Sequence, residues 1–571
     1  MKKFLLGILV GVVLAALTAV VLVLSAVRLG DSKAAVASGT TLVLPLAGGL
    51  PEKPPVSLPI PFIGGPAPLT VHDIWSTLSR AATDQRIKAL VIELGRLDAG
   101  WAKVDELRQN IANFRKSGKP VYVFLKAPRT REYYLATAGD RIFCAPEDIF
   151  DVKGIRAELL YWKNTLDKIG VRVHVQYAGR YKDAGDTYTQ TSMAPSTRES
   201  LGLVLDGLYT RLVSAVAEGR KQSPQTIQAW LDDGPYTAQQ AANKGLVDAL
   251  RFEDQVYGDL EKKLASGTLK KMSVRDYMRA IGPERDGNKR VALVVGEGAI
   301  LRGSGSDAMG TDEGFTSGAF IRMLRRVRED AAIQGVILRV DSPGGDAFAS
   351  DEILREVKLL RDRKPTVISM SDYAASGGYY VAMTGDPVVA YPSTITGSIG
   401  VLFTMVDIKG LYDKLGINRE VLTRGRNADI DSLYGPPSEE ARAKIQSGID
   451  EFYRDFVGKV AAGRKRPYEA VAPLAEGRVW LGQHARERGL VDELGGLDKA
   501  VEILRKKAGF AGGDKLQIVT YPPKRTVWEQ LMKAGEAPSV EARIARLLGI
   551  DPRAFEHQGY LRMAPYRLAL D

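Results

Sequence analysis

The chain contains two copies of one sequence pattern, and this duplication constrains its fold more than any other feature. Moving the 571-residue sequence along itself by 246 positions brings the copies into register. Matching pairs include Ile87 and Ile333, Asp105-Glu106 and Asp351-Glu352, Tyr133-Tyr134 and Tyr379-Tyr380, Gly139-Asp140 and Gly385-Asp386, Gly179-Arg180 and Gly425-Arg426, and, after a two-residue gap, Gly245-Leu-Val-Asp248 and Gly489-Leu-Val-Asp492. A register kept this long predicts a tandem duplication with its junction near Met272–Asn288.

Within each copy, apolar runs typical of strands alternate with amphipathic helical stretches. The expected strands are Ala89–Leu94, Val121–Leu125, Val291–Val295, Gly335–Val340 and Thr366–Met370, and the expected helices include Val104–Phe114, Ser350–Leu360, Ser376–Thr384 and Ser438–Ala462. This alternation is typical of α/β folds. We therefore predict two tandem α/β domains, which agrees with a length too great for one core.

The N-terminus predicts a membrane anchor. Lys2 and Lys3 precede an uncharged run of 24 residues, Phe4–Val27. As a helix this run would span about 36 Å, enough to cross a hydrocarbon core of about 30 Å. The lysines predict a cytoplasmic N-terminus, a single pass through the inner (cell) membrane and export of the remaining chain to the periplasmic or extracytoplasmic side. The alternative is a cleaved signal peptide, whose apolar core is usually about 7–15 residues long.

The sequence divides into five segments. Residues 44–68 carry eight prolines, which favours an extended tether or a segment that leads into the first domain. The predicted segments are a cytoplasmic tip and transmembrane anchor (1–30), a Pro-rich linker and approach to the first domain (31–70), an N-terminal repeat (71–280), a C-terminal repeat (281–512) and a C-terminal extension (513–571).

Composition excludes several classes of function. The formal charge is +11, but lysines and arginines are spread along the chain and form no basic run with interleaved aromatics. We therefore expect no nucleic-acid partner, and contact with anionic lipid explains the charge at least as well. Cys144 is the only cysteine, so no intrachain disulfide can form, and its apolar neighbours predict a core position. The histidines show no metal-ligand spacing, so we expect no metal site; they are His72, His174, His484 and His557.

The two copies differ where strands end. The second copy has Asp341-Ser-Pro-Gly-Gly345 after one buried strand and Ala375-Ser-Gly-Gly-Tyr379 after the next. The first copy has Gly95-Arg-Leu-Asp98 and Thr130-Arg131-Glu132 at these places, without the glycine pairs. Conversely, it carries Tyr181-Lys182-Asp183 where the second copy has Asn427-Ala428-Asp429. Each half holds what the other lacks, which suggests one site shared between them.

Ser376 is the candidate nucleophile of that site. It lies between a predicted strand and a helix that opens with Gly377-Gly378, where free backbone N–H groups can hold a developing oxyanion. Gly344-Gly345 could supply another donor. The alternative is a serine that only caps the helix. A lysine can serve as base if burial lowers its pKa from about 10.4 by about three units, at a cost of roughly 4 kcal/mol. Sequence physics alone does not select which lysine.

These motifs together resemble the signal peptide peptidase A (protease IV) family in its long, duplicated form. The resemblance rests on the paired halves, the two glycine loops, Thr396-Gly-Ser-Ile-Gly-Val401 and Gly179-Arg-Tyr-Lys182, and covers roughly residues 40–510 and the anchor. It implies a ClpP/crotonase-like fold in which Ser376 is the nucleophile, Lys182 from the other repeat is the general base and Ser398 orients the lysine. The sequence departs from the family pattern at Ala184-Gly-Asp-Thr-Tyr188, which leaves the pocket shape open.

The predicted function is peptide hydrolysis by a membrane-anchored serine endopeptidase without a cofactor. The predicted oxyanion and substrate-binding residues are Gly344, Gly345 and Gly377. The resemblance implies hydrophobic remnant signal peptides as substrates and a homotetramer at the membrane. Two alternatives stay open: a crotonase-type acyl-CoA enzyme, which export argues against, and a catalytically inactive membrane scaffold.

Overall fold

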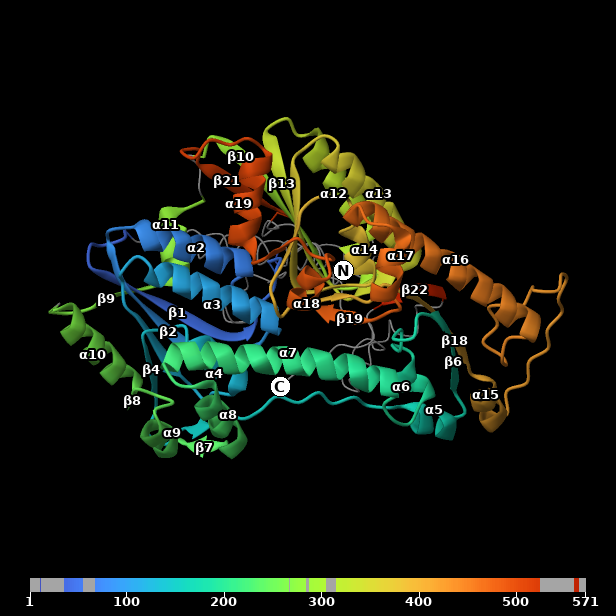
Figure 1. The fold of residues 1–571 in the computed structure, drawn as a ribbon, viewed down its shortest axis with the longest axis horizontal. Helices are drawn as coiled ribbons and strands as arrows, with labels where there is room; N and C mark the ends of the chain where they lie inside the picture. The colour runs from blue at the N-terminus through green and yellow to red at the C-terminus, as the bar shows by residue number, and fades with distance from the viewer. Residues whose placement is uncertain are drawn as a thin grey trace.

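The computed structural model describes residues 11, 35–54, 67–265, 267–283, 287–303, 315–523 and 559–563 (Figure 1). The predicted membrane anchor at 4–27 lies outside the described residues, apart from Gly11, and so do residues 524–558.

The first repeat is built on a six-stranded parallel sheet with the order β8-β4-β3-β2-β1-β9. Its strands are β1 (Thr40–Gly49), β2 (Ile87–Asp98), β3 (Val121–Leu125), β4 (Arg141–Cys144), β8 (Ala249–Leu250) and β9 (Lys270–Ser273). All five residues of β3 are buried, as a central parallel strand requires. Cys144 is fully buried at the end of β4, so its predicted core position is confirmed.

The second repeat forms a sheet with the same arrangement, β20-β16-β15-β13-β10-β21, and β17 and β19 extend it beside β15. Its strands are β10 (Lys289–Glu297), β13 (Ile333–Ser342), β15 (Thr366–Ala375), β16 (Val388–Ala390), β17 (Ile395–Gly397), β19 (Val479–Leu481), β20 (Glu493–Leu494) and β21 (Leu516–Tyr521). This correspondence confirms the tandem α/β domains, and every expected strand lies within an observed one.

The structure moves the limits of both repeats. The first domain begins at Thr40 in β1, inside the segment predicted as a Pro-rich linker, because Leu42, Leu44 and Leu46 alternate into its core. The second repeat continues to Tyr521 in β21, inside the segment predicted as an extension, because β21 pairs with β10 as β9 pairs with β1.

A third sheet joins the two repeats. Its order is β12 (Phe315–Thr316), β11 (Ile300–Leu301), β14 (Gly344–Asp346), β22 (Gly559–Met563), β18 (Val401–Asp407) and β6 (Arg172–Ala178). Strand β6 belongs to the first repeat, yet it runs antiparallel to β18 of the second over its whole length. This pairing carries the chain just after β6, which includes Lys182, to the second repeat.

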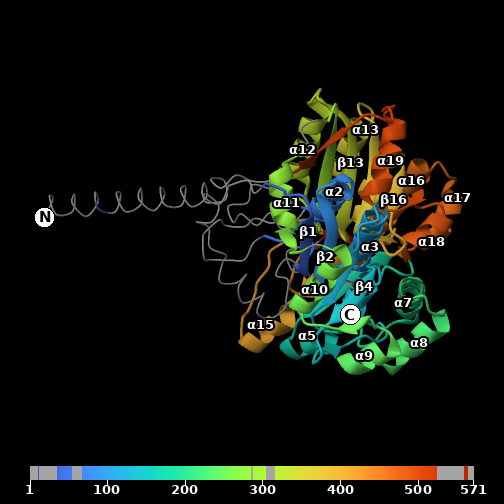
Figure 2. The ribbon, with the colours of Figure 1, turned by 90° about the vertical axis from the view of Figure 1, so that its left-hand side faces the viewer.

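Helices cover both faces of the two large sheets. In the view of Figure 2, α7, α8 and α9 lie on one side of the molecule and α12 and α13 on the opposite side. The helices are α2 (Val71–Thr83), α3 (Trp101–Arg115), α4 (Thr130–Ala136), α5 (Lys163–Ile169), α6 (Asp186–Thr189), α7 (Pro195–Arg220), α8 (Pro224–Asp233), α9 (Ala238–Lys244), α10 (Glu253–Leu264), α11 (Val274–Ile281), α12 (Ser317–Glu329), α13 (Ala347–Arg361), α14 (Gly377–Val381), α15 (Lys409–Leu415), α16 (Glu439–Arg464), α17 (Tyr468–Val471), α18 (Gly482–Glu487) and α19 (Leu497–Lys507). Two short strands, β5 (Ile149–Phe150) and β7 (Tyr236–Thr237), pair with each other.

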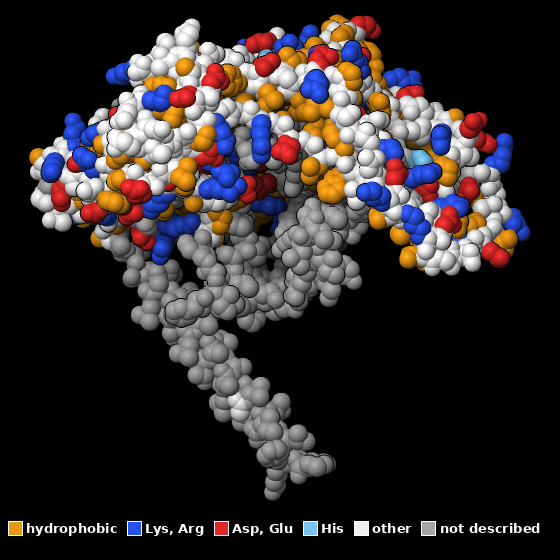
Figure 3. All heavy atoms as spheres, turned by 90° about the horizontal axis from the view of Figure 1, so that it is seen from below, with side chains coloured by type: hydrophobic (Ala, Val, Ile, Leu, Met, Phe, Trp, Pro, Cys, Tyr) orange, Lys and Arg blue, Asp and Glu red, His pale blue; other side chains and the backbone are white. Residues whose placement is uncertain are grey.

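Helix α7 is, among the described residues, the one helix long and apolar enough to cross a membrane by length and composition. It instead packs Val204, Leu208 and Leu212 into the core of the first repeat. The surface elsewhere is mixed, and the face shown in Figure 3 intersperses Lys and Arg with Asp and Glu.

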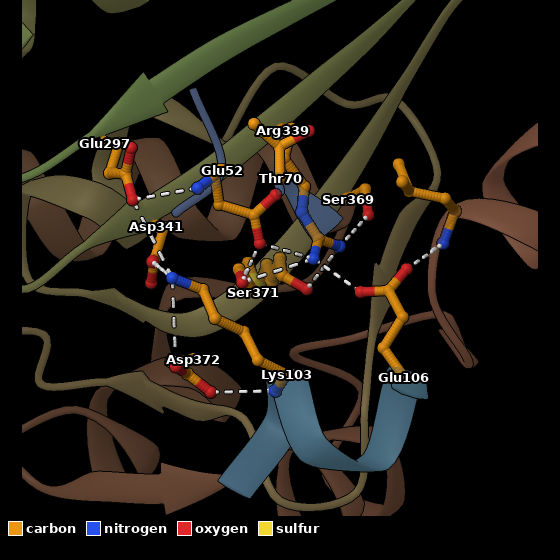
Figure 4. Close-up of polar contacts among 12 residues, drawn as sticks. Glu52, Thr70, Lys103, Glu106, Glu297, Arg339, Asp341, Ser369, Ser371 and Asp372 are labelled. Atoms are coloured by element: carbon orange, nitrogen blue, oxygen red, sulfur yellow. Dashed lines mark hydrogen bonds and ion pairs between the residues drawn. The ribbon is translucent and has the colours of Figure 1, made fainter. Parts of the chain in front are cut away.

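Buried charges hold the repeats together (Figure 4). Arg339 of β13 is fully buried, and its guanidinium lies 2.7 Å from Glu52 and 2.5 Å from Glu106, both in the first repeat. Nearby, Lys103 of the first repeat lies 2.7 Å from Asp341 of the second. Because such pairs are costly to leave unmatched, this network ties the two sheets to one relative placement.

Candidate active site

Ser376 connects β15 to α14 with a backbone conformation that residues other than glycine rarely adopt. Its φ is 54° and its ψ is −115°, and its N–H donates to the Gly397 carbonyl at 2.8 Å. Such conformations cost about 1–3 kcal/mol and concentrate at functional sites. The side chain makes no capping hydrogen bond with α14. Ser376 thus occupies the N-cap position of α14, but its hydroxyl does not cap the helix.

Lys182 reaches this serine from the first repeat through a loop that packs on the second. The Tyr181 N–H donates to the Glu476 carbonyl at 2.8 Å, and the Lys182 N–H donates to Gly179 at 3.0 Å. Gly477 has a φ of +77°, and a Cβ built on it would lie 2.6 Å from Lys182 Cβ. Only glycine allows the backbone at 477 to approach the lysine this closely.

The three predicted polar residues meet at the lysine amine. Lys182 Nζ lies 2.8 Å from Ser376 Oγ, 3.0 Å from Ser398 Oγ and 3.0 Å from the Ser398 carbonyl oxygen. All three residues are fully buried. A neutral amine has two N–H groups and one lone pair, so it can donate to both Ser398 oxygens and accept the Ser376 proton.

The predicted glycines lie beside the serine. A Cβ on Gly378 would lie 2.5 Å from the Ser342 carbonyl, so the start of α14 touches the loop that leads into β14. Gly344 and Gly345 belong to β14, and Gly377 is the first residue of α14. The Gly344 N–H already donates to Ser342 Oγ at 3.2 Å. A Cβ on Gly345 would lie 2.0 Å from the Ile300 carbonyl, which makes glycine necessary there.

Sequence reasoning missed two contributors to this site. Gly477 gave no sign of its contact with Lys182, because 295 positions separate them in the sequence. Asp183 follows the lysine and is 5% exposed. It accepts a hydrogen bond from the Thr197 hydroxyl, while its Oδ1 has no partner among the described residues. Burial raises the pKa of the Asp183 carboxyl to about 6.

We expect Asp183→Asn to stabilise the protein above pH 6. The folded carboxyl titrates near 6 rather than 3.8, so stability falls as pH rises through this window and stays reduced above it. The ionised carboxylate therefore costs about 3 kcal/mol, and asparagine can still accept the Thr197 bond. Urea unfolding should show a gain at pH 8 and little change near pH 4. An equal gain at both pH values would contradict the assignment.

No group of three or more His, Cys, Asp or Glu side chains in the described parts of the chain is arranged to hold a metal ion. In the described parts of the chain, the side-chain nitrogen within hydrogen-bond distance of Ser376 Oγ is Lys182 Nζ and not a histidine nitrogen. His557 lies outside the described residues.

Comparison with known proteins finds one peptidase family and two proteases of similar sequence. The model of peptidase family S49 matches residues 113–266 and 358–511, once in each repeat. The protein named serine protease SPPA, chloroplastic, of Arabidopsis thaliana is 32% identical over 491 residues, which cover 85% of this chain and 71% of that protein. Protease 4 of Salmonella typhi is 31% identical over 477 residues, 81% of this chain and 75% of its own. A solved ClpP1 mutant from Listeria monocytogenes aligns with 37% of this chain and 94% of its own, at 12% identity and a TM-score of 0.24.

Proposed function

The chain belongs to peptidase family S49 and is a serine protease of that family, and on this premise we propose that Ser376 is the nucleophile and Lys182 the general base. The observation that carries the proposal is the contact of 2.8 Å between Ser376 Oγ and Lys182 Nζ, both fully buried. The family resemblance inferred from the motifs is confirmed by the same comparisons. Replacing either residue by alanine tests the pair directly, because each variant should lose about 10³-fold or more in kcat/KM.

The proposed reaction passes through an acyl-enzyme. Lys182 takes the Ser376 proton as Oγ attacks the carbonyl carbon of the peptide, and the resulting ammonium gives that proton to the leaving amine. Water then attacks the ester, with the amine again as base, and releases the carboxylate product. The carbonyl oxygen and the hydroxyl oxygen of Ser398 each accept a hydrogen bond from Lys182 Nζ. These two bonds orient the lone pair of the lysine nitrogen toward Ser376. We assign the oxyanion to the backbone amides of Gly345 and Gly377, with Gly344 beside them.

We propose that peptide substrates bind as an added strand between β14 and β18. Support comes from β22, a segment of this chain that occupies that place. Its backbone pairs antiparallel with Gly344–Asp346 on one side and with Leu402–Thr404 on the other. A peptide that adds a strand gains backbone hydrogen bonds without regard to its sequence, and side-chain pockets add preference. The remnant signal peptides implied by the resemblance are apolar, and we propose that they bind here in an extended form.

Removal of residues 559–571 should therefore raise kcat/KM several-fold for a short apolar peptide, because β22 and the substrate compete for the same strand edges. The measurement is initial-rate kinetics on the full chain and on a chain that ends at Gln558. The rate at which a fluorophosphonate labels Ser376 should rise in parallel. Unchanged rates in a truncated chain with unchanged thermal stability would place the substrate elsewhere.

We also propose that the protein is anchored in the membrane by the uncharged run at Phe4–Val27. Protease added outside the inner membrane of spheroplasts should digest the chain beyond about residue 30 while the anchor stays in the membrane fraction. Protection of the bulk of the chain would rule out this topology.

The homotetramer stays a prediction, and an exposed apolar surface supports self-association. Two equivalent arms, around α5 and α15, carry Trp162, Ile169, Leu415 and Leu422 with exposed fractions of 43% to 94%. Large exposed apolar surfaces mark interaction sites. Sedimentation velocity of the detergent-solubilised chain tests this, and a monomer at all concentrations would exclude it.

A further inference from the structure

The first repeat retains a cavity where the second repeat has its candidate catalytic serine. The 246-position offset places Thr130 on Ser376 and Glu132 on Gly378. Thr130 and Glu132 lie after β3, and Leu97 lies at the end of β2, so all three stand at the carboxyl edge of the first sheet. A cavity of about 710 Å³ opens at this edge, between the first sheet and the strand ends of the second.

This cavity cannot repeat the chemistry of the second repeat. The Thr130 hydroxyl donates to the Lys153 carbonyl at 2.6 Å, so it is not free to attack. The Glu132 carboxylate, which is 2% exposed, accepts the Leu97 N–H at 2.8 Å and the Arg129 N–H at 3.1 Å. An internal carboxylate thus occupies the backbone amides of both loops. The cavity can therefore bind a ligand, but it cannot carry out this reaction.

The cavity presents hydrogen-bond donors without partners. The side chains of Arg96 and Arg129 form no ion pair with any residue that the structure describes. Arg131 Nε and Trp101 Nε1 are buried without a partner among the described residues, and Trp101 is only 5% exposed. The Arg131 guanidinium lies 5.7 Å from the Trp101 ring centroid, so these two donors are neighbours. Buried donors are normally satisfied, so these require an acceptor.

The buried carboxylates of the same cavity are already engaged (Figure 4). Asp372 accepts two backbone N–H groups at 2.8 and 2.9 Å, and Glu297 accepts two at 3.0 and 3.1 Å. Asp341 accepts one backbone N–H at 3.0 Å and pairs with Lys103 at 2.7 Å. Asp98, at the exposed rim, is the remaining acid. On the side of the first repeat, three arginines (Arg96, Arg129 and Arg131) face two acids (Asp98 and Glu132), and this excess of positive charge favours an anionic ligand there.

Apolar side chains form part of the cavity wall. Leu97, Ile395, Pro343 and Leu208 line it beside the arginines. Its volume suits a ligand of one to a few residues. From the donors and these walls together, we propose that the first repeat binds a carboxylate carried by an apolar residue, such as the free C-terminus of an apolar peptide. The arginines and Trp101 bind the carboxylate, and the apolar walls hold the side chain. No bond is made or broken, so this site goes beyond the proposed reaction and is independent of Ser376.

The test is a binding measurement on the full-length Ser376→Ala chain, with N-acetyl-leucine as the probe. Because Trp101 lies in the cavity, tryptophan fluorescence should change saturably with N-acetyl-leucine, and Trp101→Phe should remove this signal. N-acetyl-leucinamide, which lacks the charge, and inorganic phosphate, which lacks the apolar group, should each bind at least tenfold more weakly. Equal binding of the amide would overturn the carboxylate assignment, and equal binding of phosphate would reduce the site to a general anion site and overturn the proposal.

Substitutions of single arginines test whether N-acetyl-leucine binds in this cavity. Arg131→Gln and Arg129→Gln should each weaken N-acetyl-leucine binding about tenfold, whereas Arg302→Gln, which lines a different cavity, should leave it unchanged. Because Arg131 also donates to the Ala99 carbonyl, thermal unfolding of that variant serves as a folding control. Arg129→Gln is the second variant, because the Arg129 side chain forms no ion pair with a described residue. Wild-type affinity in both variants, with thermal unfolding unchanged, would refute the proposal.

Discussion

Replacing Ser376 by Ala should lower kcat/KM for a peptide substrate by about 10³-fold or more, and replacing Lys182 by Ala should do the same. The serine supplies the attacking oxygen, and the lysine is its one titratable contact within hydrogen-bond distance in the described part of the chain, at 2.8 Å. A loss of this size corresponds to more than about 4 kcal/mol of transition-state stabilisation. The measurement is steady-state kinetics with each purified variant.

The double variant should be no worse than either single variant, because residues that act as a unit are not additive. Lys364→Ala is a matched control, since Lys364 is also buried but donates to the Asp330 and Ile333 carbonyls, away from the site. It should retain kcat/KM within about threefold when corrected for folded protein. If Lys182→Ala kept activity within about tenfold of wild type, another group would have to be the base.

Much of this architecture could be predicted from local patterns and from the internal repeat. The strand at Val121–Leu125 and the helix that begins after Ser438 match the structure within a residue or two, because apolar runs and capping residues are local signals. Ser376 could be singled out because the glycine pairs are missing from the other copy. Lys182 required the family resemblance, since nothing in its own neighbourhood distinguishes it from a surface lysine.

The contacts between distant segments could not be predicted in the same way. Strand β6 pairs with β18 across more than two hundred positions, and no local pattern sets such a register. The same holds for β22, which inserts between β14 and β18. Arg339 did leave a sign, because a charged residue within the apolar run Gly335–Val340 is costly unless it is paired. The identity of its partners, however, depends on how the two sheets meet.

Replacing Arg339 by Met should destabilise the protein by about 3–5 kcal/mol at pH 8, because it leaves two buried carboxylates without their counter-charge. Arg339 is fully buried, and it donates to Glu52, Glu106, Ser369 and Ser371. Burial raises the pKa of Glu106, and Arg339 offsets part of that effect. Without the guanidinium, Glu52 and Glu106 would both be driven to take up protons on folding.

The pH dependence and a matched set of variants separate this mechanism from simple loss of packing. A carboxyl whose pKa is raised in the folded state lowers stability as pH rises, so the deficit of Arg339→Met should be larger at pH 8 than at pH 5. Adding Glu52→Gln and Glu106→Gln to it should recover most of the loss, since the unpaired charges are then gone. Arg279→Met, which breaks a pair on the surface with Asp276, should cost less than about 1 kcal/mol. The measurement is the free energy of unfolding by urea for the wild type, Arg339→Met, the triple variant and the surface control. A deficit that does not change with pH, or that the glutamine substitutions fail to relieve, would mean that Arg339 stabilises the junction by shape and not by charge.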